Sequence, residues 1–331
     1  MKGLGYSNGR ERIMKRTWNR VKKPLVFTAL GIAVLTGPLC GCGKQEQKTE
    51  QKQEEKKELT PEEKEKLNEK LHDAIKKGQG SGVIRSLLKR GADINAKNNQ
   101  GSTPLWNALY LNKTDEAKAL IEAGANVNEQ DDVGRVFVLE AVARGHEDVV
   151  DLAIKKGADI NAKGPKGETP LMRAISVRKL PMVEYLIKKN ADVNATNDMG
   201  QSCMWLAWSH VRSNSTIVKA LIEAGADLNA KSPNGGILII DAVDSGLESI
   251  VDMMVKKEVD VNATDGKGQT ALMHAVYRNK TRIAEILLSA QGINVNLRDD
   301  RGGTALSRAE RKRNSNVVEL LKQHGAVEEE E

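Results

Sequence analysis

The sequence returns to one phrase about every 33 residues, and this repetition limits the possible folds more than any other feature. RGADINAKNNQGSTPLWNAL recurs as KGADINAKGPKGETPLMRAI and, further along, as EVDVNATDGKGQTALMHAV. A glycine marks the same point in seven copies: Gly101, Gly134, Gly167, Gly200, Gly235, Gly268 and Gly302. A unit this short cannot bury its own apolar side, so the pattern predicts copies stacked in a row.

A second register is alanine, which stands seven positions after each of these glycines. The alanines are Ala108, Ala141, Ala174, Ala207, Ala242, Ala275 and Ala309. A position that stays small indicates helices of neighbouring copies in close approach. Each copy then carries apolar residues at helical spacing, as at Ile217, Val218 and Leu221. The sequence therefore predicts helix pairs that share one continuous core.

This pattern resembles the ankyrin repeat, in which D-x-x-G-x-T-P-L-H-x-A precedes a second helix and then G-A-D-V-N-A. Seven copies match, and a degenerate copy with GADINA at 91–96 precedes them, so the resemblance covers about residues 67–326. It implies an all-α ankyrin-repeat solenoid of about seven full repeats and one degenerate N-terminal repeat. Each repeat would be a helix-turn-helix unit with a finger turn.

The expected array occupies residues 60–326 and is followed by an acidic tail at 327–331. Its first helix is predicted to start with Thr60 as the cap, Pro61 in the first turn and Glu63 closing a capping box. In the last copy, the first helix reads LSRAERKRNS, and its charges are interpreted as the polar outer surface that a terminal repeat needs.

The N-terminus reads as a secretory signal, because a basic region precedes an apolar segment at 24–39 that is short for a membrane span. Met14 would start a more compact signal. LCGC at 39–42 resembles the bacterial lipoprotein box, which implies lipidation of Cys42 by fatty acids such as palmitate. Cys40 follows a leucine and does not fit the box. The alternative is an uncleaved signal anchor.

We therefore expect a signal peptide at 1–41 and a solvated, charged tether at 42–59, which is nearly all Lys, Glu and Gln. The lipoprotein resemblance implies a location on the cell membrane, facing the periplasm or the cell exterior. Gly43 follows the lipidated cysteine where Asp would be a retention signal, which favours the outer membrane in a cell with two membranes.

The charge distribution argues against a nucleic-acid binder. The formal charge is +6, but residues 1–41 hold 8 Lys/Arg and 1 Asp/Glu, which leaves 43 bases and 44 acids in the rest. Charge-driven binding to nucleic acid needs a basic stripe. No such stripe is visible in the sequence after the leader.

Nothing in the sequence has the spacing of a metal or cofactor site, so neither is expected. His72 and His146 fall where ankyrin repeats carry a histidine for turn hydrogen bonding, and no H-E-x-x-H motif occurs. The GQGSG run at 78–82 follows an expected helix and is interpreted as a turn, not a phosphate loop. Cys203 is expected to be a buried, unreactive thiol, and a nucleophile activated by a distant histidine is the alternative.

The copy at 197–231 departs most from the pattern, because its turn between helices is two residues longer and it holds Trp205 and Trp208. Local repacking and an aromatic binding anchor are both open. The ankyrin resemblance implies a concave binding face made of finger turns and first helices. On this sequence the face includes Asn107, Tyr110, Arg135, Arg173, Ser176, Leu206, Trp208, His210, Asp241, His274, Tyr277, Arg278 and Arg308.

Such a mixture of charge, hydroxyl and ring suits a folded protein partner better than a lipid, a nucleic acid or a small molecule. We therefore expect a non-enzymatic scaffold or inhibitor that is anchored by lipid in the envelope. Two alternatives remain at this point: an exported ankyrin factor acting on host proteins, and an accessory subunit of an envelope enzyme.

Overall fold

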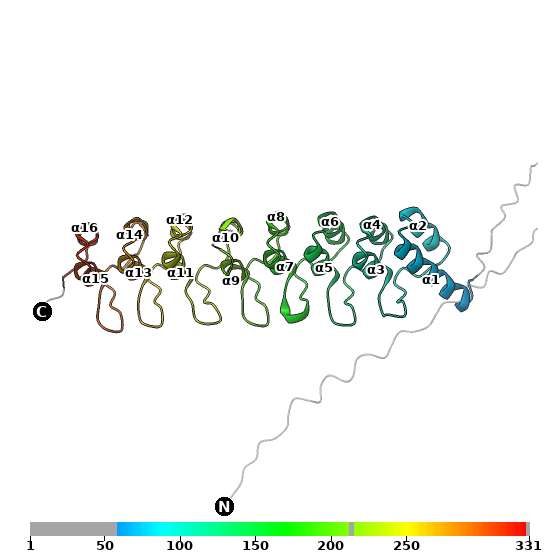
Figure 1. Cartoon of the computed structure of the whole chain (residues 1–331), viewed down its shortest axis with the longest axis horizontal. Coiled ribbons are helices and arrows are strands. Elements are labelled where there is room, and N and C mark those ends of the chain that lie inside the picture. The colour runs from blue at the N-terminus through cyan, green and yellow to red at the C-terminus, as the bar shows by residue number, and fades with distance from the viewer. Residues whose placement is uncertain (1–57, 212–214, 329–331) are drawn as a thin grey trace, which may run out of the picture. The chain divides into compact units, whose positions relative to one another are not determined.

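A computed structural model describes residues 58–211 and 215–328, and residues 57–331 form one compact unit. The predictions for the signal peptide, Cys42 and nearly all of the tether, and for the end of the tail, lie outside the described residues. The helices pair in chain order (Figure 1): α1 Pro61–Lys77, α2 Ser81–Lys89, α3 Pro104–Tyr110, α4 Thr114–Glu122, α5 Phe137–Arg144, α6 Glu147–Lys155, α7 Pro170–Ser176, α8 Leu180–Lys188, α9 Cys203–Trp208, α10 Ser215–Glu223, α11 Leu238–Ser245, α12 Glu248–Lys256, α13 Ala271–Tyr277, α14 Thr281–Leu288, α15 Ala305–Arg311 and α16 Ser315–Gln323.

Each of the last seven pairs is preceded by a loop that contains a register glycine, which we call a finger turn. Figure 1 shows the second helices in one row, the first helices in a parallel row, and the finger turns beyond the first helices. The predicted all-α solenoid, with seven full repeats and one degenerate N-terminal repeat, is confirmed. Strand-like pairing in the described residues is limited to isolated bridges, such as that between Gln130 and Val136.

The helix starts follow from hydroxyl residues in the sequence. The Oγ1 atom of Thr60 accepts the N–H of Glu63 at 3.2 Å, and the Glu63 carboxylate accepts the Thr60 N–H at 2.8 Å. The predicted capping box is therefore present, and such a cap stabilises a helix by about 1 kcal/mol. Further along, the side-chain oxygens of Thr103, Thr169 and Ser202 cap α3, α7 and α9, each by accepting one backbone N–H of the first turn.

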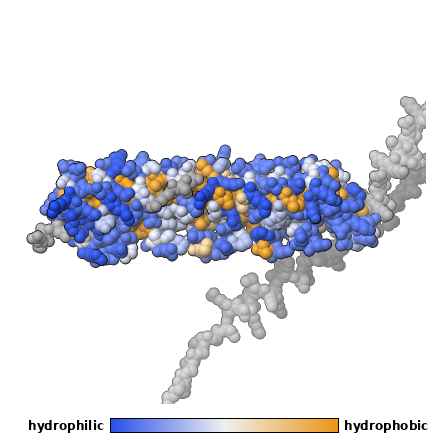
Figure 2. Space-filling model, in the orientation of Figure 1, coloured by the Kyte–Doolittle hydropathy of each residue, from blue (hydrophilic) through white to orange (hydrophobic). Residues whose placement is uncertain are grey.

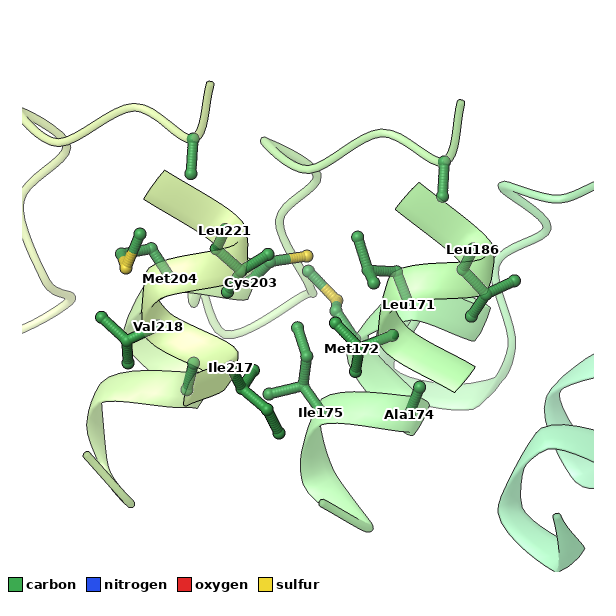
Figure 3. Packing of buried hydrophobic residues seen from close by; sticks show 14 of the residues in the cluster. Leu171, Met172, Ala174, Ile175, Leu186, Cys203, Met204, Ile217, Val218 and Leu221 are labelled. Atoms are coloured by element: carbon green, nitrogen blue, oxygen red, sulfur yellow. The ribbon is translucent and has the colours of Figure 1, made fainter. Parts of the chain in front are cut away.

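The core runs along the row of pairs and is confirmed at the predicted alanines. All seven are buried, and six of them are completely inaccessible. In Figure 3, Met172 and Ile175 of α7 lie between their own pair and the next one, which contributes Cys203 and Ile217. The extensive contacts between helices occur within a pair or between successive pairs. Stability is therefore distributed along a one-dimensional array.

A ladder of asparagine side chains ties each repeat to the next. The Oδ1 atom of each accepts a backbone N–H of the following copy at 2.7–3.1 Å, and in the last step Asn296 accepts the N–H of Val327. The members are Asn68, Asn95, Asn128, Asn161, Asn194, Asn229, Asn262 and Asn296. Asn68 lies in α1, and the other members are the asparagines at the G-A-D-V-N-A position, which hold the spacing between repeats at about 1 kcal/mol for each bond.

Most finger turns are closed by a side chain that accepts two backbone N–H groups. Asp265 accepts those of Lys267 and Gln269, and Asn197 accepts those of Met199 and Gln201. The register glycine is required at Gly268, where φ is +70° and a Cβ atom would lie 3.0 Å from the Asp300 backbone nitrogen. In the third finger, a short 3-10 helix, η1 (Pro165–Gly167), takes the place of the capped turn.

The GQGSG run has the structure that was predicted for it. Helix α1 ends at Lys77, Gly78 adopts the left-handed conformation, and α2 begins at Ser81. The run is therefore the connection between two helices of one pair. Among the described helices, none is both long enough and apolar enough to cross a membrane.

Candidate partner-binding surface

The residues predicted to form the concave face all lie on first helices, immediately after them, or in finger turns. They separate into an N-terminal, a central and a C-terminal group. Asn107 of α3 belongs to the first and lies 3.4 Å from the His72 ring, which in turn contacts the Ala96 carbonyl at 2.8 Å. His72 therefore has the predicted structural role in a turn.

The N-terminal group is an aromatic cluster formed by Trp106, Tyr110, Asp131, Arg135 and Arg144. The Trp106 and Tyr110 rings stack with centroids 5.5 Å apart, and the two guanidinium groups lie 5.2 and 5.3 Å from the Tyr110 centroid. The Tyr110 hydroxyl donates to Asp131 at 3.1 Å, and Arg135 donates to the same carboxylate at 2.6 Å. The Asp131 carboxylate, the two guanidinium groups and the Tyr110 ring therefore find interaction partners within this cluster.

Burial of the Tyr110 ring raises its pKa to about 12. Burial alone would also raise the pKa of Asp131, but hydrogen bonds from the N–H groups of Arg135 and Val133 and from the Arg135 side chain lower it overall. Asp131 is therefore ionised at neutral pH. The carboxylate holds the finger turn and the tyrosine of the preceding repeat in one network.

The central group is partly used by the fold itself. Leu206 and Trp208 of α9 are half-buried against the core, and Arg173 pairs with Glu168 at 2.9 Å. The His210 ring contacts Arg178 at 3.1 Å. Trp205 donates its indole N–H to the Ala230 carbonyl at 2.9 Å, which fastens α9 to the following loop. For Trp205 these contacts support the repacking interpretation of this copy.

His274 lies between two carboxylates at the start of the C-terminal group. Its Nδ1 atom is 2.9 Å from Asp244 and its Nε2 atom is 3.1 Å from Asp265, while Arg278 also donates to Asp244 at 2.5 Å. Burial raises the pKa of nearby Asp241, and the negative charge of Asp244 adds to that rise. Half-buried carboxylates of neighbouring repeats therefore contact His274 and Arg278 here.

Beyond His274, the last two first helices and their finger turns enclose a basic pocket with a volume of about 1140 Å³. Seven Lys or Arg residues and two acids line it, together with His274 and Tyr277. The basic residues are Lys267, Arg278, Arg298, Arg301, Arg308, Arg311 and Lys312. Tyr277 is 57% exposed, and the Lys312 ammonium lies 4.4 Å from its ring centroid.

Arg308 anchors the wall of the basic pocket. Its guanidinium pairs with Asp299, and the two side chains are only 11% and 4% exposed. Its Nε atom is buried and has no hydrogen-bond partner. Burial would raise the pKa of Asp299, but the N–H groups of Gly303 and Arg301 and the charge of Arg308 lower it overall. This pair supports the last finger turn from inside.

Five basic residues of the pocket were absent from the predicted face: Lys267, Arg298, Arg301, Arg311 and Lys312. Arg311 and Lys312 had been interpreted as the polar end of the array. In the structure they line the pocket with residues of the preceding repeat, whereas Arg313 lies on a separate surface with α16. For two of the five, the sequence offered a signal: Lys267 and Arg301 occupy the finger-turn position immediately before the register glycine in the last two copies.

The other candidates for chemistry have structural roles or none. Cys203 is completely buried, and burial raises the pKa of its thiol to about 12, so the thiolate is scarce at neutral pH. The Nε2 atom of His146 has no hydrogen-bond partner, so this atom lacks the turn hydrogen bond expected of it. Within 58–211 and 215–328, no three His, Cys, Asp or Glu residues are grouped so that they could hold a metal ion.

The hydrophobic patches on the face in Figure 2 are small and separated by hydrophilic residues. The end with the last repeat is mostly hydrophilic in this view, as expected for a surface that contains the charged residues of α15 and α16. Apolar area alone therefore does not mark a binding site on this face.

The family model described as Ankyrin repeats (3 copies) matches three segments, residues 71–164, 138–232 and 239–329. These segments cover most of the chain, and the chain belongs to the ankyrin repeat family. No curated protein matches it. Ankyrin repeat proteins are generally binding scaffolds without enzymatic activity, so membership indicates a role in protein–protein interaction.

Proposed function

We propose that this protein binds a protein partner of the cell envelope through its first helices and finger turns, as a scaffold or an inhibitor. The observation that carries the proposal is the basic pocket, where charged groups, a histidine and an exposed tyrosine converge from successive repeats. A pocket of such mixed chemistry provides charge for specificity and a ring as an anchor. Binding of this kind needs no chemical step by the array itself.

The second part of the proposal is that Cys42 carries a lipid that anchors the array to the membrane. It rests on LCGC at 39–42, after a basic and then an apolar segment, and on the charged tether that follows. A lipid with two or three acyl chains would hold the protein firmly, whereas a single chain gives only reversible binding. The anchor would keep the array close to envelope proteins.

Metabolic labelling with a fatty-acid probe tests the anchor. Cys42→Ser should abolish labelling, and the matched change Cys40→Ser should leave it intact because Cys40 does not fit the lipoprotein box. Labelling that survives Cys42→Ser would show that the assignment of the lipid to this residue is wrong.

Crosslinking and pull-down of the full chain from its own envelope tests the binding role. Tyr277→Ala should lose the dominant partner, because the ring is exposed and belongs to the pocket. Lys188→Ala, at an exposed position at the end of α8, should retain it. Trp208→Ala needs a parallel stability measurement, since Trp208 also packs against the core. Equal recovery from the Tyr277 and Lys188 variants would remove the pocket from the proposal.

The two alternatives have less support. An enzyme subunit that uses Cys203 would need an accessible thiolate, and the thiol is buried with a raised pKa. An exported factor acting on host proteins would use the same face, and the partner recovered by crosslinking would distinguish it from an envelope scaffold.

A further inference from the structure

Three of the seven basic side chains that line the basic pocket are not balanced locally. Arg308 pairs with Asp299, Arg278 with Asp244, and Lys312 lies over the Tyr277 ring. By contrast, no hydrogen bond or ion pair holds the side chains of Lys267, Arg301 and Arg311 within the described residues. Concentrating like charges in one concavity is costly unless a ligand of opposite charge neutralises them.

The fold fixes the base of this pocket at Asp299 and Arg308. The unpaired side chains of Lys267, Arg301 and Arg311 form what we call its rim, which stays charged. Asp299 accepts the N–H groups of Arg301 and Gly303, which sets the finger turn, and Arg308 secures the same carboxylate from α15. Gly303 also lines the pocket and has no side chain, so it leaves space next to Asp299 and Arg311. The cations of the rim therefore surround an open hollow with an exposed ring on one side.

We propose that this pocket binds an acidic segment of the protein partner, with at least two carboxylates in an extended chain. The inference rests on the proposed protein-binding function and specifies its ligand chemistry. Side chains that point to one side of an extended chain are about 6–7 Å apart, so two carboxylates of one short segment can enter the same pocket. Arg side chains on the rim can each hold a carboxylate by two hydrogen bonds.

The extent of positive charge favours an acidic protein segment over a nucleic acid. A nucleic-acid strand would need a basic track along several repeats, since its phosphates continue at regular spacing. Towards the N-terminus the same surface turns acidic, at Asp241 and Asp244, and then exposes Met199. A continuing phosphate backbone would meet Asp244 there, whose cation Arg278 is already engaged. An acidic segment of a few residues would end before that point.

Fluorescence anisotropy with the full chain in neutral detergent tests the proposal. The probe is a labelled hexaglutamate peptide, compared with hexaglutamine and with a six-nucleotide single strand of DNA. We expect hexaglutamate to bind and hexaglutamine not to bind, with an affinity that falls as salt is added.

The variant for this assay is Arg301→Gln with Arg311→Gln, since neither side chain has a partner that the fold needs. It should weaken hexaglutamate binding at least tenfold while the melting temperature stays unchanged. The matched control is Lys156→Gln with Lys188→Gln, which removes two exposed cations at the ends of the second helices α6 and α8 and should change the affinity less than twofold.

Three results would overturn the inference: no binding of hexaglutamate, equal loss in both double variants, or tighter binding of the oligonucleotide through Arg301 and Arg311. The envelope crosslinking experiment separates this failure from failure of the proposed function. If Tyr277→Ala still loses a partner while hexaglutamate does not bind, the binding role stands and only the acidic ligand is wrong.

Discussion

The aromatic cluster and the basic pocket occupy corresponding positions in the array but use their charges differently. Tyr110 and Tyr277 both stand nine residues after their register glycine. Tyr110 is covered by Trp106 and by Arg135 of the next finger, whereas glycine (Gly303) stands at the repeat position of that arginine in the last finger, and Tyr277 is 57% exposed although Lys312 lies over its ring. The Tyr110 ring is therefore part of the structure, whereas the Tyr277 ring stays available for binding. Residue type at a repeat position does not define a site until its neighbours are known.

The largest effect should come from the two arginines that pair with a finger-turn aspartate. Arg308→Ala leaves the almost completely buried Asp299 carboxylate without its cation and should lower the free energy of unfolding by about 3 kcal/mol. Arg135→Ala should cost about 1 kcal/mol or less, because Arg135 is 46% exposed. Urea denaturation of both variants measures the difference.

A second variant keeps this prediction specific. Adding Asp299→Asn to Arg308→Ala should recover part of the loss, since the amide oxygen can still accept the finger N–H groups without a charge. Equal costs for Arg308→Ala and Arg135→Ala would contradict the distinction between a buried and an exposed pair.

The tyrosines give the next largest difference. Tyr110→Ala should lower the free energy of unfolding by about 2–3 kcal/mol, because a stacked, hydrogen-bonded ring is lost. Tyr277→Ala should change it by no more than about 0.5 kcal/mol, since the ring is mostly exposed. Thermal unfolding of the two variants side by side checks this, and similar losses would show that Tyr277 is structural as well.

Acid should loosen the finger turns closed by aspartate before those closed by asparagine. The pKa values of Asp131, Asp265 and Asp299 are lowered in the fold, because hydrogen bonds to the carboxylates outweigh the effect of burial. Their stabilisation is complete above the ordinary aspartate pKa of about 4 and is lost as the pH falls through the lower folded values.

Hydrogen exchange between pH 5 and pH 2.5, corrected for the intrinsic rate, should therefore show greater loss of protection at the Asp131, Asp265 and Asp299 turns. The turns at Asn98 and Asn197 provide the internal control, since an amide does not titrate in this range. Uniform loss across all five turns would indicate global unfolding instead.

The smallest effect concerns the turn between the two helices of a repeat. The position eleven residues after the register glycine is Gly145 in the second full copy and Arg313 in the last, where φ is +54°. Arg313→Gly should raise the free energy of unfolding by about 1 kcal/mol by removing left-handed strain. Gly145→Ala should lower it by a similar amount. A loss of melting temperature in the glycine variant would mean that the Arg313 side chain contributes contacts that outweigh the strain.

Sequence reasoning identified the fold because the constraints on it are local and repeated. The register glycines, the buried alanines and the Thr60 cap each follow from the geometry of one turn or one helix contact. Cys203 and the GQGSG run were also interpreted correctly, because their apolar or helical surroundings are adjacent in sequence.

The candidate surface was predicted less completely, since it depends on which side chains meet across repeats. Arg311 and Lys312 could be recognised as charged residues. That they line one pocket with Lys267, which lies 44 and 45 residues earlier in the chain, could not be predicted. Trp205 could be recognised as unusual, but its hydrogen bond joins it to Ala230, which lies 25 residues further along the chain. The role of Cys42 remains a prediction from its motif.

Site-specific photo-crosslinking in the native envelope tests directly whether the basic pocket contacts the protein partner. A photoreactive phenylalanine analogue, which keeps an aromatic ring, replaces Tyr277 in the basic pocket of one variant and Lys188 on the second-helix side of another. If the partner binds at the basic pocket, we expect one dominant crosslinked partner from position 277 and none from position 188. A partner captured at position 188 and not at position 277 would contradict binding at the pocket.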